Sequence, residues 1–192
     1  MEMKGEQLIA APRSVVWAGL NDPDVLRESI PGCEELVKQS DNEFAAVVHA
    51  KVGPVSARFR GKVTLSDISP GHSYRISGEG QGGAAGFGKG GAQVSLADDG
   101  GKTRLSYAVT AQVGGKLAQI GSRLIDGAAR KMADDFFSRF NEVVVRRAGL
   151  APSAPPPVPA PPPSRGLPTW AWVSALVITA MAILYLMVTG RI

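Results

Sequence analysis

Residues 166–190 contain no charged side chain, and Arg165 and Arg191 flank this run on its two sides. A helix rises about 1.5 Å per residue, so this run would reach roughly 37 Å, more than the hydrocarbon core of about 30 Å. Two tryptophans and a tyrosine lie near its ends, where aromatic rings favour the headgroup region. We expect a transmembrane helix here, since an uncharged run of this length fits a buried core helix poorly.

The expected orientation follows from the flanking charges and from the first residues. No basic stretch followed by an apolar one marks the chain for secretion. Arg146, Arg147 and Arg165 precede the uncharged run and Arg191 follows it, in weak agreement with positive charge on the cytoplasmic side. We therefore expect a single-pass protein of the inner (cytoplasmic) membrane, anchored through its C-terminal helix, with its soluble domain in the cytoplasm.

A proline-rich linker is expected over residues 151–165. The stretch from 151 to 164 contains eight prolines in fourteen residues. Such a run prefers the extended polyproline II conformation, at about 3.1 Å per residue, and spans roughly 40 Å. It would hold a domain of residues 1–150 away from the bilayer, and a docking site for a proline-recognising module is the less favoured alternative.

Charge and cysteine content limit the function of residues 1–150, which have the size of one domain. The chain has a net charge of +4, half of it from the two arginines beside the uncharged run, so we expect no nucleic-acid partner. The single cysteine, Cys33, excludes a disulfide framework. His49 and His72 stand apart from cysteines and paired carboxylates, which argues against a zinc site.

Alternation of apolar and polar residues predicts β-strands through the middle of the chain. The clearest case is residues 55–67, where one face is apolar and the other carries Arg58, Arg60 and Lys62. The same pattern recurs after turn sequences near residues 69–71 and 98–101. Before these strands we expect, in order, a short strand at 6–10, helices at 12–20 and 24–29, and strands at 36–39 and 43–52.

A long helix is expected at the end of the domain, over residues 115–146. Its apolar residues recur at steps of three and four, and this stripe requires a broad surface to cover. We predict an α+β fold in which a curved antiparallel sheet surrounds the helix and leaves a cavity between them. The stripe consists of Leu117, Ile120, Leu124, Ala128, Met132, Phe136, Phe140 and Val144.

Several segments resemble the G-subunit family of carbon monoxide dehydrogenase, part of the SRPBCC or START-like superfamily of helix-grip folds. The resemblance covers residues 1 to about 147, and the glycine-rich block with the helix-start block is its most specific part. The proline linker and C-terminal anchor also occur among members, so the chain resembles a membrane-anchored one. The matching segments are residues 11–23, 30–33, 52–55, 78–87 and 114–126.

The resemblance implies a domain for a hydrophobic ligand that serves a molybdenum hydroxylase of the carbon monoxide dehydrogenase type. Such members are thought to bring the oxidoreductase to the membrane, or to carry a quinone between bilayer and enzyme. The implied ligand is menaquinone or ubiquinone, held without a covalent bond.

Eight glycines fall within residues 78–91, where strands are expected. Glycine costs about 0.5–1 kcal/mol in a strand relative to alanine, so the block requires a use. One interpretation is space for a ligand ring or for the long helix on the concave face, and the other is a bulged, sharply bent edge. The block also fits G-x-G-x-x-G, but a dinucleotide site needs a helix after these glycines, and we expect strands on both sides.

The sequence shows no catalytic constellation. Inward positions are nearly all apolar, and Cys33 fits a packed residue better than a nucleophile. Tyr74 and Tyr107 could each offer a hydroxyl to a quinone carbonyl, although core tyrosines need no ligand to explain them. Arg58, Arg60 and Lys62, with Arg75 nearby, form either an ordinary solvated face or a patch for an acidic partner or anionic lipid.

We therefore expect a binding module, not an enzyme, that holds a lipophilic small molecule at the membrane and recruits the oxidoreductase. One alternative is a scaffold whose own side chains fill the cavity and which only docks the enzyme. Another is a cyclase-like enzyme, against which the apolar interior argues. From strand alternation and the helix stripe, the expected ligand-binding residues are Val48, Phe59, Phe87, Tyr107, Ile120, Leu124 and Met132.

Overall fold

The computed structural model describes residues 1–150 of the chain. The linker expected at 151–165 and the transmembrane helix expected at 166–190 lie outside the described residues. Among the helices of residues 1–150, none combines the length and the apolar character that crossing a bilayer requires.

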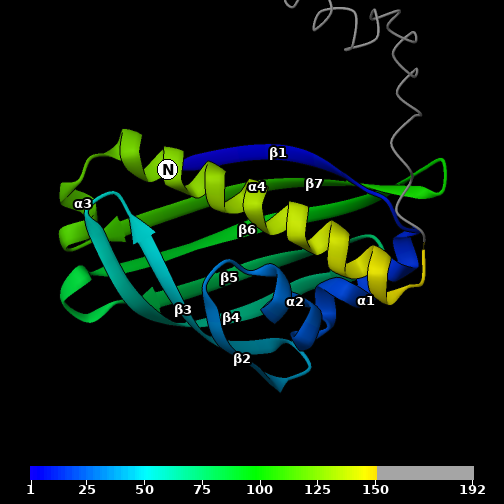
Figure 1. Ribbon diagram of the computed structural model, residues 1–192, viewed down its shortest axis with the longest axis horizontal. Helices are drawn as coiled ribbons and strands as arrows, with labels where there is room; N and C mark the ends of the chain where they lie inside the picture. The colour runs from blue at the N-terminus through cyan, green and yellow to red at the C-terminus, as the bar shows by residue number, and fades with distance from the viewer. Residues whose placement is uncertain (151–192) are drawn as a thin grey trace, which may run out of the picture. The chain divides into compact units, whose positions relative to one another are not determined.

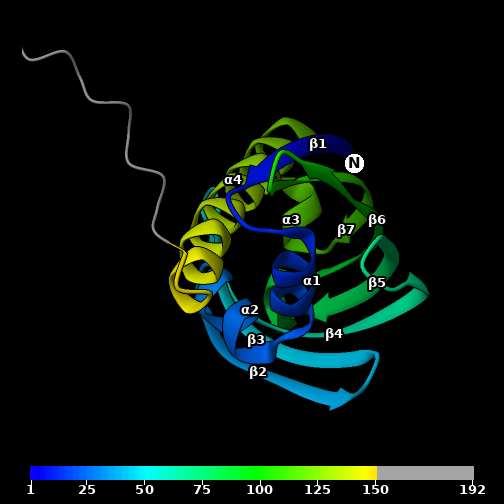
Figure 2. The same cartoon turned by 90° about the vertical axis from the view of Figure 1, so that its right-hand side faces the viewer.

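One antiparallel sheet of seven strands forms most of the domain, in the order β1-β7-β6-β5-β4-β3-β2. It curves around a long helix, as Figure 1 and the end-on view of Figure 2 show, and this confirms the α+β, helix-grip prediction. The strands are β1 (Glu2–Ile9), β2 (Cys33–Ser40), β3 (Glu43–Val52), β4 (Val55–Ser69), β5 (Ser73–Gln81), β6 (Phe87–Asp99) and β7 (Lys102–Gly114).

The strand register explains the alternation seen in the sequence. Phe44 of β3 lies opposite Val63 of β4, and Val63 lies opposite Gly78 of β5, so all three share the concave face. Lys62 and Glu79, one position away, face outward as a cross-strand pair. Apolar residues therefore gather on the concave side, which faces the long helix.

Two short helices cover one end of the curved sheet: α1 (Arg13–Asn21) and α2 (Pro23–Ser29). The chain enters α1 directly after Pro12. The Asp22 carboxylate accepts hydrogen bonds from the backbone N–H groups of Asp24 and Val25, at 2.8 and 3.2 Å, and Pro23 follows it at the first helical position. This cap and proline define the start of α2.

The C-terminal helix is divided into two parts. A short α3 (Lys116–Gln119) precedes α4 (Ser122–Arg147), and Gly121 separates them with a φ of 90°. The prediction of one continuous helix over 115–146 was wrong at this point, because a residue with that backbone angle cannot continue a right-handed helix.

The core lies where the last turns of α4 meet the sheet, α1 and α2. Phe140 is completely buried, and Val143, Val144 and Val145 follow it in the interior. Thr103, also fully buried, donates a hydrogen bond from its hydroxyl group to the backbone oxygen of Ala11 at 2.7 Å. The buried ends of α1, β1, β7 and α4 are thus joined in one packed unit.

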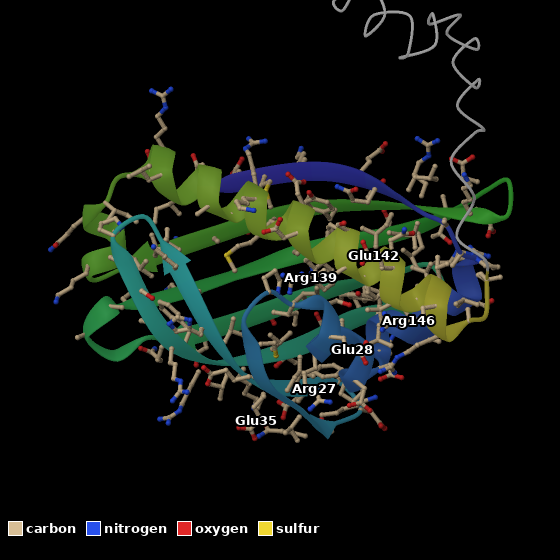
Figure 3. The ribbon with its side chains drawn as sticks, in the orientation of Figure 1. Arg27, Glu28, Glu35, Arg139, Glu142 and Arg146 are labelled. Atoms are coloured by element: carbon tan, nitrogen blue, oxygen red, sulfur yellow. The ribbon has the colours of Figure 1, made fainter. Side chains whose placement is uncertain are left out.

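Ion pairs join α2 to the last turn of α4. Arg146 contacts one oxygen of the Glu28 carboxylate at 2.6 Å, and Arg147 contacts the other at 2.5 Å. Figure 3 shows Glu28 and Arg146 facing one another between these helices. The hydrogen bond from Arg147, ahead of the other charge interactions, lowers the pKa of Glu28 below its ordinary value of 4.5.

The Glu28 contacts predict a pH dependence of stability. Because the folded domain favours the ionised carboxylate, the stabilisation is present above the ordinary pKa of Glu28 and is lost as the pH falls through the lowered value. We expect the melting temperature of the wild-type protein to fall further between neutral and acid pH than the melting temperature of Glu28→Gln. The group is exposed, so the difference is expected to be small. Glu35→Gln is the control, because Glu35 of β2 forms no ion pair within residues 1–150. Equal falls in melting temperature for the wild type and both variants would show that the Glu28 ion pairs do not cause the pH dependence.

Candidate functional site

An apolar cavity of about 270 Å³ lies between α4 and the concave face of the sheet. The helices that cover the end of the sheet, α1 and α2, contribute to its wall along with six strands and α4. Its lining is apolar except for one tyrosine. The lining residues are Leu20, Leu26, Ile30, Leu36, Phe44, Ala46, Val63, Leu65, Tyr74, Ile76, Val94, Leu105, Phe136 and Phe137.

Burial along the concave face falls from one end of the domain to the other. Near α1 and α2, inward residues such as Leu65, Val94 and Leu105 are buried, and we call this the closed end. Toward α3 and the β3–β4 turn, inward residues such as Phe59 and Val113 are only half-buried. α4 has no fully buried residue between Ile125 and Phe140, and within this stretch Phe136 and Phe137 are half-buried against the core. We call the α3 side the open end (Figure 1).

Tyr74 is the one residue of the cavity lining whose side chain carries a polar atom. Its side chain is 3% exposed, and its ring meets that of Trp17 edge to face with centroids 5.5 Å apart. Burial raises the pKa of the Tyr74 phenol, so it stays protonated at physiological pH. A protonated phenol can donate one hydrogen bond, but the surface that lines the cavity is almost wholly apolar.

Three of the seven expected ligand-binding residues lie on the concave face. Val48 and Phe59 are paired across β3 and β4, and Phe59 leans over Gly82. Tyr107 crosses over Gly5 of β1, and its ring stacks on Phe137 of α4 with centroids 5.2 Å apart. All three are half-buried and lie outside the set that lines the closed cavity.

Of three further expected residues, Ile120 and Leu124 lie at the open end and Met132 lies further along α4. Ile120 and Leu124 approach Gly53 at the tip of the β3–β4 turn. Met132 lines a groove of about 230 Å³ between α4 and the edge of β3. Leu124 is 54% exposed and Met132 is 37% exposed, and neither lines the closed cavity.

The placement of Phe87 differs from the sequence expectation. Gly88 lies opposite Gly80 and shares the concave face, so Phe87, one position earlier, faces outward. Its ring lies over Gly114 of β7 and is 39% exposed. The expectation that Phe87 forms a cavity wall was wrong, because the strand enters the sheet one position out of phase with the assumed alternation.

The sequence reasoning missed the residues that line the closed cavity. Alternation had marked Tyr74, Val94 and Leu105 as inward, but alternation does not show which inward residues touch a cavity and which touch one another. The missing information was the position of α1 and α2 over one end of the sheet. A signal for it was present in Leu20 and Leu26, apolar residues on the two short helices.

Other motifs that the sequence singled out have structural roles. The G-x-G-x-x-G stretch runs from β5 through a single 3₁₀ turn (Gly83–Ala85) into β6, so the helix that a dinucleotide site requires does not follow it. Burial raises the pKa of the Cys33 thiol, which donates a weak hydrogen bond to the Glu35 backbone oxygen at 3.4 Å. Within residues 1–150 no three His, Cys, Asp or Glu side chains are grouped to hold a metal ion.

Three of the four basic residues that the sequence singled out on the outer face form ion pairs, and Arg60 forms none within residues 1–150. Arg58 contacts Glu34 at 2.9 Å, and Lys62 contacts Glu43 at the same distance. Arg75 contacts Asp67 at 3.0 Å. These exposed pairs contribute little to stability, and they reduce the net positive charge that this face presents to a partner.

The sheet, the long helix and the cavity between them define a START-like fold. A START superfamily protein from Mycobacterium smegmatis has a TM-score of 0.59 at 12% identity, covering 76% of this chain and 98% of that one. The Zhui aromatase/cyclase from Streptomyces sp. R1128 has a TM-score of 0.56 at 12% identity, covering 77% and 95%. A conserved protein from Geobacillus kaustophilus has a TM-score of 0.72 at 27% identity, covering 76% and 96%.

The chain belongs to the CoxG family, named for the G subunit of carbon monoxide dehydrogenase, whose model matches residues 5–145. No curated protein matches the sequence. Because the family takes its name from a subunit of an oxidoreductase, membership indicates an accessory protein, and the structural neighbours show the fold.

Proposed function

We propose that this chain is a membrane-tethered accessory protein that binds a quinone, menaquinone or ubiquinone, and couples a cytoplasmic molybdenum hydroxylase of the carbon monoxide dehydrogenase type to the membrane. The observation that carries the proposal is the cavity of about 270 Å³ beneath α4, with its apolar lining. A pocket of this kind selects a ligand by shape and apolar contact, with a few polar groups that fix its orientation.

The cavity wall also supports a role in binding over a role in catalysis. Tyr74 carries the single polar side chain among the lining residues, and these residues include no base or nucleophile beside it. The likeness to an aromatase/cyclase, at 12% identity, concerns the fold alone.

Two further observations support the proposed partner enzyme and the proposed attachment to the membrane. The family name supports association with carbon monoxide dehydrogenase. The uncharged run at 166–190, preceded by the proline-rich linker, supports a tether that keeps the domain near the inner membrane and its quinone pool.

Ligand extraction from the full chain tests the quinone. We expect the protein, purified from membranes in detergent, to yield quinone enriched over phospholipid relative to the membranes it came from. The measurement is mass spectrometry of an organic extract, with an unrelated single-pass protein purified in the same way as the control. A quinone to phospholipid ratio equal to that of the membrane would refute the carrier function and leave the scaffold alternative.

Sedimentation with membranes tests the recruitment. We expect the partner enzyme to pellet with membranes that contain the full chain and to remain in solution with membranes that contain residues 151–192 alone. Equal amounts in both pellets would show that the domain does not recruit the enzyme.

A further inference from the structure

The glycines of the central strands form a surface without side chains on the concave face. Gly61, Gly80 and Gly88 lie side by side on β4, β5 and β6, and Gly78 and Gly90 lie side by side in the next row. We call these five residues the glycine floor. The register of β4 with β5 shifts only beyond Ser66, and β5 pairs with β6 without a shift, so no bulge accounts for the glycines.

The backbone leaves room for a side chain at two of these positions and not at the other three. A Cβ on Gly90 would collide with the backbone oxygen of Thr110, and a Cβ on Gly61 or Gly78 would lie only 3.0 Å from a backbone oxygen of the neighbouring strand. A Cβ on Gly80 or Gly88 would meet nothing closer than 3.8 or 4.0 Å, and neither residue has a positive φ. Since β-branched and aromatic residues favour strands, Gly80 and Gly88 lower strand stability without a local structural reason. No side chain lies within 4 Å of the position that a Cβ would take on either residue.

The glycine floor continues from the closed cavity toward the open end. Val63 lines the cavity and lies directly opposite Gly78. Strands lie about 4.8 Å apart and alternate residues of a strand about 6.8 Å apart, so the floor measures roughly 10 Å by 7 Å. The part of α4 between Ile125 and Phe140, which has no fully buried residue, crosses the concave face in Figure 1.

We propose that the glycine floor seats a planar ring face-on, while the closed cavity holds the aliphatic part of the same ligand. This inference rests on the proposed function and assigns the two parts of the ligand to two surfaces. A flat peptide surface contacts the whole face of a ring, whereas the branched side chains of the cavity suit a flexible hydrocarbon. The cavity of about 270 Å³ is smaller than the pockets of about 300–1,000 Å³ that hold drug-sized ligands, so a ring with its tail requires the additional space.

Fluorescence quenching of Trp17 tests this assignment in the full chain. Trp17 contacts Tyr74 of the cavity wall, and Trp170→Phe with Trp172→Phe removes the other two tryptophans. The two probes are a ubiquinone with two isoprene units and a doxyl-labelled straight-chain fatty acid, both of which quench tryptophan. Gly88→Val places a branched side chain on the glycine floor. We expect it to lower the affinity for the ubiquinone roughly tenfold or more, and the affinity for the fatty acid by less than about twofold.

The controls separate failure of this inference from failure of the proposed function. Ser77→Val, on the outward face of β5, is expected to leave both affinities unchanged. Gly80→Ala, which adds one methyl group, replaces Gly88→Val if thermal unfolding shows that the valine variant does not fold. Unchanged ubiquinone binding in the floor variant, or an equal loss for both probes, would overturn the inference alone. If neither probe quenched Trp17 in the protein that keeps all five floor glycines, the proposed function itself would be overturned.

Discussion

Phe140→Ala is expected to lower the free energy of unfolding by about 3–5 kcal/mol. The Phe140 ring is completely buried and stacks on Phe136 with centroids 5.7 Å apart, at the point where α4 meets α1. Its removal takes away apolar contacts and leaves a void that the surrounding helices and strands fill only in part. Because small domains have a total stability of about 5–15 kcal/mol, much of the protein would be unfolded at modest denaturant concentrations. Urea unfolding followed by Trp17 fluorescence measures the change.

Leu124→Ala is the matched control for this experiment. Leu124 belongs to the same helix and the same apolar stripe, but its side chain is 54% exposed at the open end. We expect a change within about 0.5 kcal/mol. Comparable losses for the two variants would mean that α4 is packed evenly along its length, contrary to the burial described above.

Ala46→Phe is expected to reduce quinone affinity roughly a hundredfold or more, equal to about 2.7 kcal/mol. Ala46 lies on the concave face of β3 and lines the closed cavity, so a phenyl ring at this position occupies the space of the ligand. Filling an existing cavity also adds apolar contacts, and we expect stability to stay the same or to rise by up to about 2 kcal/mol. Trp17 quenching by the short-tailed ubiquinone measures the affinity.

Ala45→Phe provides the control at the neighbouring position. Ala45 lies opposite Lys62 on the outward face of the same strand, so the same ring added there cannot reach the cavity. We expect ubiquinone affinity close to that of wild type. If Ala46→Phe still bound ubiquinone normally, the closed cavity would not be part of the binding site.

The fold was predictable because apolar and polar residues alternate along its strands in a simple two-residue pattern. Each strand has one face against the helix and one against water, so its two-residue period can be read directly, and β3 occupies the predicted residues 43–52. The break at Gly121 was not predictable in the same way. Glycine is tolerated within helices, as at Gly127 of α4, so composition alone does not show which glycine adopts a positive φ.

The candidate site was less predictable than the fold. Inward-facing residues could be identified from alternation, but the choice among them depends on which end of the sheet is covered. That arrangement depends on contacts between Leu20, Leu26 and residues much later in the chain, which a local pattern does not contain. Phe87 shows a separate difficulty. It is the first residue of β6, and an error of one position in where the strand begins reverses the face that its side chain is expected to take.

The ion pairs of Glu28 with Arg146 and Arg147 have a mechanical consequence. They fasten the last turn of α4 to α2 at the closed end, only a few residues before the sequence enters the proline-rich stretch. Any tension from a tether would therefore act first on the most tightly packed corner of the domain. The middle of α4, which has no fully buried residue between Ile125 and Phe140, lies apart from these ion pairs and would carry less of that load.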